Sequence, residues 1–395
     1  MSSVITTRTT RTTRTTRTAR PSRTPFKLVR FLGAVAVMTA SWGAAAQDKW
    51  VVGQSAPLSG GNAKFGTDIR DGAQAYFAMV NARGGVNGGQ IELISIDDKN
   101  DRKTAGANTK TLLDNKNLVA LFGFASATLS LDALPQAEAK GVAFFAPFSG
   151  ANPVRVKNPV LFTVRASYGE EMEKILNFWT SLGFKRVTVL HYDDEVGKQN
   201  FELVTAYLKK INLVPQALPL KRNAVVGKAE VEALLAQHPD VLINTVLSGA
   251  AAQLQKELVG MSHMLPTSSL SFVGADQYVK AVGEAGAGVS ITQVVPHPTS
   301  SLPVVRECAK ALEAAGSKTA MNTTQLEACF GAKILTEGIR RAKKPVNSKS
   351  VLEALANLGT YDLGGFSVTF DGGAQHGSNF VDMARVTKDG RLLTR

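Results

Sequence analysis

Two loops of the sequence carry residue types that bind small anions. Ser126, Ala127 and Thr128 follow an apolar run and open a helical pattern, and Ser149 comes directly after the next apolar run. The first N–H groups of a helix have no partner inside the helix, so together with the Ser126 hydroxyl they can hold a carboxylate. The residues alone also allow a simpler role for Ser126, that of an ordinary helix cap.

One carboxylate stands where it could bind the opposite charge. Asp276 follows an apolar run, expected to be a strand, that ends at Val273 and Gly274. A ligand ammonium taken out of water needs such a partner, because an uncompensated buried charge is costly. A helix cap is the alternative role that the sequence leaves open for Asp276.

Motifs of the common enzyme classes are missing from the sequence. It contains no G-x-S-x-G elbow, no G-x-G-x-x-G between a strand and a helix, no Walker A loop and no H-E-x-x-H. The histidines do not fall at the spacing of ligands to one metal ion; they are His191, His238, His263, His297 and His376. We therefore expect a binding protein rather than an enzyme, with no metal and no cofactor.

Cys308 and Cys329 are the two cysteines of the chain, and both lie on apolar faces of expected helices. In an oxidising compartment they could form a disulfide. Two buried thiols are the alternative, because the sequence does not place the two Cα atoms within bonding range.

The first 46 residues differ in composition from the rest. A Thr-Thr-Arg repeat spans residues 6–18, twelve uncharged residues follow at 31–42, and three alanines occupy 44–46. A basic stretch, a short apolar core and small residues in this order are typical of a secretory signal peptide. We expect cleavage near Ala46-Gln47 and a mature protein outside the cytoplasmic membrane.

Most of the excess positive charge lies in the same segment. The 395-residue chain has 45 Lys and Arg against 32 Asp and Glu, for a formal net charge of +13. Eight of these basic residues and no acid occur in residues 1–46, so residues 47–395 carry +5. Hydrophobic residues make up 44% of the chain, which excludes a disordered basic protein. No nucleic-acid partner is expected.

The loops described above must be positioned by alternating strands and helices. Short apolar runs predict strands at residues 50–54, 91–96, 119–123, 142–145, 186–191, 241–246, 271–274, 289–294, 366–370 and 380–386. Helical spacing of apolar residues predicts helices at 68–83, 102–116, 128–140, 169–182, 197–211, 303–315 and 322–341. This alternation indicates an α/β fold with parallel sheets, whose binding sites lie at the carboxyl ends of the strands. The length suggests two domains or two lobes.

Several short runs occur along the chain in a specific order. They are GQSAPLSG (53–60), NARGGVNG (81–88), DD (97–98), LFGF (121–124), APFSGA (146–151), RASY (165–168) and VVP (294–296). In this order they resemble the periplasmic leucine/isoleucine/valine-binding protein family, the type I solute-binding proteins of ABC importers. The resemblance implies the type I periplasmic-binding-protein fold, with two Rossmann-like lobes, three crossovers and a ligand cleft between the lobes. Lobe 1 would comprise residues 47–166 and 296–379, and lobe 2 residues 167–295 and 380–395.

The resemblance also implies a set of ligand-binding residues. The family holds the ligand carboxylate at the loops that match residues 123–128 and 147–150, and the ammonium at the position of Asp276. The implied set is Phe65, Ser126, Ala127, Thr128, Phe148, Ser149, Tyr168, Val196, Leu247 and Asp276. Val196 and Leu247 replace aromatic residues of the family, which leaves room for another small carboxylate or amide. Asn100 and Ala125 occupy the positions of a disulfide found in the leucine-binding proteins.

By this resemblance the chain is expected to be the periplasmic substrate-binding component of an ABC transporter. It would capture a small carboxylate-bearing solute, a branched-chain or other apolar amino acid, and as a monomer deliver it to an inner-membrane permease. A periplasmic sensor of the same fold, for amides or organic acids, is the alternative. A secreted hydrolase is disfavoured because the nucleophile motif is missing.

Overall fold

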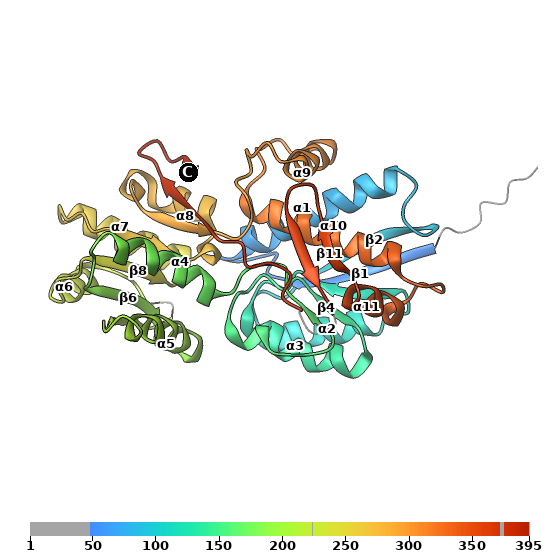
Figure 1. Cartoon of the computed structure of the whole chain (residues 1–395), viewed down its shortest axis with the longest axis horizontal. Helices are drawn as coiled ribbons and strands as arrows, with labels where there is room; N and C mark the ends of the chain where they lie inside the picture. The colour runs from blue at the N-terminus through green and yellow to red at the C-terminus, as the bar shows by residue number, and fades with distance from the viewer. Residues whose placement is uncertain (1–47, 223, 372–374, 395) are drawn as a thin grey trace, which may run out of the picture. The chain divides into compact units, whose positions relative to one another are not determined.

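The computed structural model of the chain describes residues 48–222, 224–371 and 375–394 (Figure 1). The predicted signal peptide, residues 1–46, and its cleavage site lie outside these residues. The described strands form two larger sheets and one hairpin.

The first sheet consists of parallel strands in the order β2-β1-β3-β4-β5. Its strands are β1 (Asp48–Ala56), β2 (Gly89–Asp97), β3 (Leu118–Phe122), β4 (Ala143–Phe145) and β5 (Leu161–Phe162). The connecting helices are α1 (Ala63–Ala82), α2 (Arg102–Leu113) and α3 (Ala127–Lys140). Every residue of β3 is buried, as expected for a central parallel strand covered on both faces.

The second sheet has the order β14-β13-β10-β9-β8-β6-β7. Its parallel strands are β6 (Val187–Tyr192), β7 (Gln216–Leu220), β8 (Val241–Thr245), β9 (Thr267–Ser269) and β10 (Ser290–Gln293). Two strands from the end of the chain, β13 (Asp382–Val386) and β14 (Leu392–Thr394), extend it in antiparallel pairs. The helices are α4 (Tyr168–Ser181), α5 (Glu195–Lys209), α6 (Lys228–Leu235), α7 (Ser248–Gly260) and α8 (Ala275–Val282).

Local sequence signals explain where α4 begins. Ser167 and Glu170 form a capping box, in which each side chain accepts a hydrogen bond from the other residue's backbone N–H. The buried stripe of α4 contains Met172, Ile175 and Trp179, at the spacing that gives a helix one apolar face. The predicted helix at 169–182 is therefore confirmed within one residue at each end.

After β10 the chain returns to the core of the first sheet. It forms α9 (Pro303–Ala314), α10 (Thr323–Arg341), α11 (Ser348–Ala356) and the hairpin of β11 (Gly359–Asp362) and β12 (Ser367–Phe370). Phe330 of α10 belongs to the same buried cluster as Val52 of β1 and Phe77 of α1. Gly72 permits this packing, because a Cβ atom there would lie 2.2 Å from the Gln325 carbonyl oxygen of α10. The chain thus passes between the two sheets after β5, after β10 and after β12.

The strand predicted at residues 271–274 is wrong. Ser271–Val273 is a single turn of 3-10 helix, and the strand of this region is β9 at Thr267–Ser269. Hydroxyl-bearing residues fill β9, but all three are buried because neighbouring strands flank β9 on both sides. Apolar patterning therefore pointed to the wrong segment.

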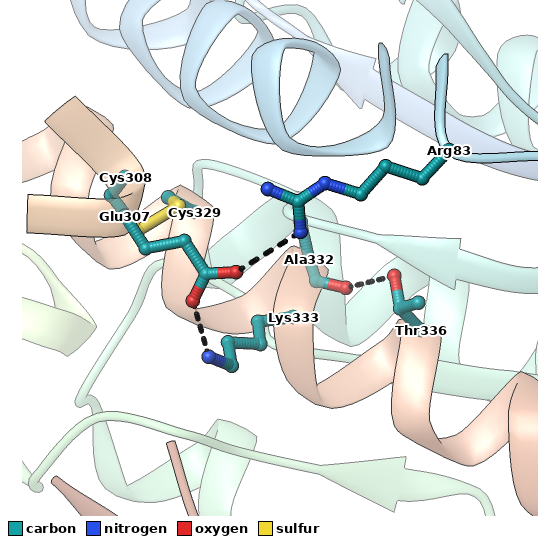
Figure 2. Close-up of a disulfide and its surroundings, with 7 residues drawn as sticks. All are labelled: Arg83, Glu307, Cys308, Cys329, Ala332, Lys333 and Thr336. Carbon is teal, nitrogen blue, oxygen red and sulfur yellow. Dashed lines mark hydrogen bonds and ion pairs between the residues drawn. A yellow bond between two sulfur atoms is a disulfide. The ribbon is translucent and has the colours of Figure 1, made fainter. Parts of the chain in front are cut away.

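The two cysteines form a disulfide between α9 and α10 (Figure 2). The Cα atoms of Cys308 and Cys329 are 5.9 Å apart. Of the two alternatives that the sequence left open, the structure has the bonded one. Next to it, Lys333 Nζ lies 2.5 Å from a carboxylate oxygen of Glu307, so an ion pair also joins the two helices.

Candidate ligand-binding cavity

A cavity of about 410 Å³ lies at the carboxyl ends of strands from both sheets. On the first sheet, its walls come from the segments that follow β1, β2, β3 and β4. On the second sheet, they come from the segments that follow β6, β7, β8 and β9. This is the edge at which parallel α/β sheets bind ligands, and a volume of this size suits a small molecule.

Most of the predicted site residues line this one cavity. They are Phe65, Ser126, Ala127, Thr128, Phe148, Ser149, Tyr168, Val196 and Leu247. Asn100 and Ala125, which the resemblance places at the positions of a disulfide, also line it. The loops that the sequence singled out for anion binding thus face the same space.

The start of α3 presents groups that can bind an anion. Ser126 has extended backbone angles at the N-cap position, and in the described structure its side chain makes no capping hydrogen bond to the helix. Its carbonyl oxygen accepts hydrogen bonds from the Ser130 N–H at 2.9 Å and the Ser130 hydroxyl at 2.7 Å. The Ser126 hydroxyl therefore remains available, with the first N–H groups of a 14-residue helix, to an anion in the cavity.

The loop after β4 forms the wall of the cavity next to the start of α3. Phe148 donates its backbone N–H to the Phe124 carbonyl at 2.8 Å. The Ser149 hydroxyl accepts from the Ala151 N–H at 3.2 Å and lies 3.5 Å from the Tyr168 hydroxyl. Burial raises the pKa of Tyr168, so its phenol is neutral and can donate a hydrogen bond at neutral pH.

Aromatic rings supply much of the apolar lining. Phe65 and Phe148 meet edge to face with ring centres 6.1 Å apart. Tyr168 and Phe272 lie with ring centres 5.1 Å apart, and all four residues line the cavity. The body of a bound ligand would therefore contact aromatic surface contributed from both sheets.

The wall from the second sheet carries an ion pair. Asp194 caps α5 by accepting the Gly197 N–H at 2.9 Å, and its other carboxylate oxygen accepts from the Arg222 Nε at 2.8 Å. The Arg222 guanidinium also lies 4.2 Å above the Tyr192 ring. Gly197 is required here, because a Cβ atom would lie 1.9 Å from the Tyr192 carbonyl oxygen.

Asp276, the predicted partner of a ligand ammonium, is not among the residues that line this cavity. Asp276 lies in the first turn of α8, and the residue of this helix that lines the cavity is Gln277. The chain turns at Gly274, with φ +69°, and α8 begins at Ala275. Successive helical residues point about 100° apart, so Asp276 and Gln277 face different directions.

The cavity also contains polar residues that the sequence did not single out. They include Asn62, Arg102, Asp194, Glu195, Arg222, Ser248 and Gln277. Arg102 forms a two-point ion pair with Asp132, with Nη2 and Oδ1 2.6 Å apart. Arg222 was missed because the strand before it, β7, contains a proline and alternates in exposure. Had the strand β7 been recognised in the sequence, a basic residue soon after its end would have indicated Arg222 as a cavity residue.

The described residues give no sign of a metal site or a membrane span. Among them, no group of three or more His, Cys, Asp or Glu side chains could hold a metal ion. None of the helices in this part of the chain is both long and apolar enough to cross a membrane.

Two sheets with three connections and a small-molecule cavity at the strand ends define a binding protein of the type I periplasmic fold. The periplasmic binding protein family model matches residues 49–391, and the chain belongs to this family.

Known binding proteins are similar to this chain in sequence and in structure. A Leu/Ile/Val-binding protein homolog 2 of Brucella abortus is 28% identical over 202 residues, 50% of this chain and 53% of that protein. The chain thus spans about half the length of this relative. A solved substrate-binding periplasmic protein of Ralstonia solanacearum is 30% identical, with a TM-score of 0.80, and the match covers 87% of this chain and 99% of that one. A possible leucine/isoleucine/valine-binding protein of Rhodopirellula baltica is 25% identical with a TM-score of 0.83, covering 88% and 96%.

Proposed function

We propose that this chain is the substrate-binding component of an ABC importer and captures a small carboxylate-bearing solute in the periplasm. The observation that carries this proposal is the start of α3. There, the free Ser126 hydroxyl and the first helical N–H groups face a cavity walled from both sheets. A helix N-terminus stabilises a partly buried anion by up to ~2 kcal/mol. The binding protein would act as a monomer and deliver its solute to an inner-membrane permease.

Capture would occur by closure of the two lobes. We assign residues 47–166 and 296–379 to lobe 1 and residues 167–295 and 380–395 to lobe 2. This division is supported by the return of α9, α10 and α11 to the first sheet's core and of β13 to the second sheet. Because the cavity is lined from both sheets, closing the lobes would remove a bound solute from water.

An apolar α-amino acid is the first candidate solute. The relatives from Brucella abortus and Rhodopirellula baltica carry names that refer to leucine, isoleucine and valine. Burying an apolar side chain of that size against the rings of the cavity would contribute about 1.5–3 kcal/mol.

A small carboxylate without an ammonium group is the second candidate. It is favoured by the absence of Asp276 from the cavity lining and by the engagement of Asp194 with both Arg222 and the α5 N-terminus. Glu195, an exposed residue of the lining, is then the carboxylate left to meet an ammonium.

Calorimetric titration with matched pairs of acids tests the proposal and separates the two candidates. The pairs are L-leucine with 4-methylpentanoate, and L-phenylalanine with 3-phenylpropanoate, which differ in the ammonium alone. We expect binding of at least one member. The amino acid of each pair will bind more tightly for the first candidate, and the acid without the ammonium for the second.

The Ser126→Ala variant tests the location of the carboxylate. We expect about tenfold weaker binding, or about 1.4 kcal/mol, because the hydroxyl contributes a hydrogen bond to a charged group. Ser181→Ala is the matched control, since Ser181 bonds the Phe178 carbonyl on the exposed end of α4. Equal affinity of Ser126→Ala and wild type would refute the site, and no binding of any of the four acids would refute the proposed solute class.

A further inference from the structure

Three charged side chains are buried beside the first connection between the sheets. Arg165 lies between β5 and α4, Glu171 lies in α4 and Glu327 lies in α10. Their exposed fractions are 2%, 0% and 8%. Buried ion pairs stabilise a fold little compared with apolar residues of the same size, and their best-attested use is to specify one arrangement of the chain.

Arg165 reaches both walls of the cavity. Its Nη1 donates a hydrogen bond to the Phe148 carbonyl at 2.9 Å. Its Nη2 donates to the hydroxyl of Ser271, the residue before Phe272. One guanidinium therefore connects the loop of the first sheet that carries Phe148 with the turn of the second sheet that carries Phe272.

Glu171 fixes the second-sheet side of this connection. Its carboxylate accepts hydrogen bonds from the Ser271 N–H at 2.7 Å and the Ser271 hydroxyl at 2.9 Å. It also accepts a hydrogen bond from the Thr292 hydroxyl of β10. The turn that bears Phe272 is thus held by α4 and β10 before Arg165 joins it to the other wall.

The contact between Arg165 and Glu327 is looser. Within the described residues, Arg165 Nε has no hydrogen-bond partner although it is buried. It lies 3.5 Å from Glu327 Oε1, an ion-pair distance without a hydrogen bond. Glu327 belongs to α10, which packs with the first sheet. The contact between Arg165 and Glu327 can therefore lengthen while the hydrogen bonds of Arg165 to Phe148 and Ser271 stay intact.

We propose that Arg165 is a positioning residue, which sets the relative placement of the two aromatic walls of the cavity through its hydrogen bonds to Phe148 and Ser271. Its ion pair with Glu327 supports the guanidinium from the first-sheet side. This inference rests on the proposed function for its effect on binding. The guanidinium suits this role because it is planar and donates in several fixed directions at once. A lysine ammonium at the same place would keep the charge without reaching both acceptors.

The test compares Arg165→Lys, Glu327→Gln and Arg186→Lys with the wild type. Arg186→Lys is the matched control, since Arg186 forms an exposed ion pair with Asp240 and does not line the cavity. Spin labels at Lys110→Cys on α2 and Lys256→Cys on α7, both exposed positions, report the distance between the two lobes without added solute. Calorimetry with L-leucine, L-phenylalanine and 3-phenylpropanoate reports binding.

We expect Arg165→Lys to broaden the label-to-label distance distribution and to weaken at least tenfold the binding of any probe that binds the wild type. Glu327→Gln keeps the shape of the side chain and therefore serves as the second variant if Arg165→Lys does not fold. We expect it to broaden the distance distribution to a smaller extent. Arg186→Lys is expected to change neither readout. A lower Tm with unchanged distance distributions in both Arg165→Lys and Glu327→Gln would overturn the proposal, because that is the result of a purely structural role. If no probe binds the wild type, the proposed function fails, and the distance distributions still decide the role of Arg165.

Discussion

Ser126 and Asp276 were both predicted to bind the ligand, and the fact that Ser126 lines the cavity while Asp276 does not has a residue-scale cause. Ser126 stands directly before α3, where the carboxyl end of β3 fixes its place beside the cavity. Asp276 lies inside the first turn of α8, where the direction of a side chain depends on the residue at which the helix begins. A loop residue after a buried strand can be placed from sequence alone, whereas a residue on a short helix cannot.

Asp240 provides a residue-scale prediction about pH. Its carboxylate accepts the N–H groups of Arg186 at 2.8 Å and Lys185 at 2.9 Å and pairs with the Arg186 guanidinium. These interactions, the backbone hydrogen bonds first, lower the pKa of Asp240 to about 2. Because the folded pKa is below the ordinary value, the stabilisation is complete above about pH 5 and is lost as the pH falls through 2.

We therefore expect Asp240→Asn to lower the free energy of unfolding by about 1–2 kcal/mol at pH 7, an amount discounted for solvent screening. The difference from wild type should shrink between pH 4 and 2. Urea denaturation across that range measures it, with Asp71→Asn, which alters the surface pair with Arg70 on α1, as the control. A difference that stays constant with pH would contradict this explanation.

At the scale of elements, the sequence predicted best those helices with a clear apolar stripe and the strands that are apolar throughout. The helix predicted at 303–315 is α9 (Pro303–Ala314), and the strand predicted at 119–123 is β3 (Leu118–Phe122). The elements that were missed include β7, which contains Pro219, and β9, which contains only Thr and Ser. Arg222 and Phe272 follow these two strands, which is why sequence reasoning did not bring them to the cavity.

The disulfide provides an element-scale prediction. It joins α9 to α10 across 21 residues of sequence, and constraining a loop of this length in the unfolded chain stabilises the fold by about 3 kcal/mol. We expect the Cys308→Ala/Cys329→Ala variant to lower the free energy of unfolding by about that amount in urea. Reductant should destabilise the wild type and leave the double variant unchanged. A wild-type urea midpoint that stays the same after reduction, verified by alkylation and mass, would contradict it.

At the scale of the whole molecule, alternating strands and helices predicted the fold class, and the resemblance supplied the order in which the chain crosses between the sheets. The return of α10 to α1, which Gly72 permits at close approach, depends on contacts between residues far apart in sequence. The charge network of Arg165, Glu171 and Glu327 has the same origin, because its members come from three separate segments. Local patterns do not report such contacts.

The central claim is that the start of α3 holds a ligand carboxylate inside the cavity. A crystal structure of the protein grown with the acid that binds most tightly in the calorimetric panel tests it most directly. We predict the carboxylate within hydrogen-bond distance of the Ser126 hydroxyl and of the Ala127 or Thr128 N–H, with the ligand body against Phe65 and Phe148. A carboxylate bound instead at Arg222, or a ligand outside the cavity, would contradict the claim.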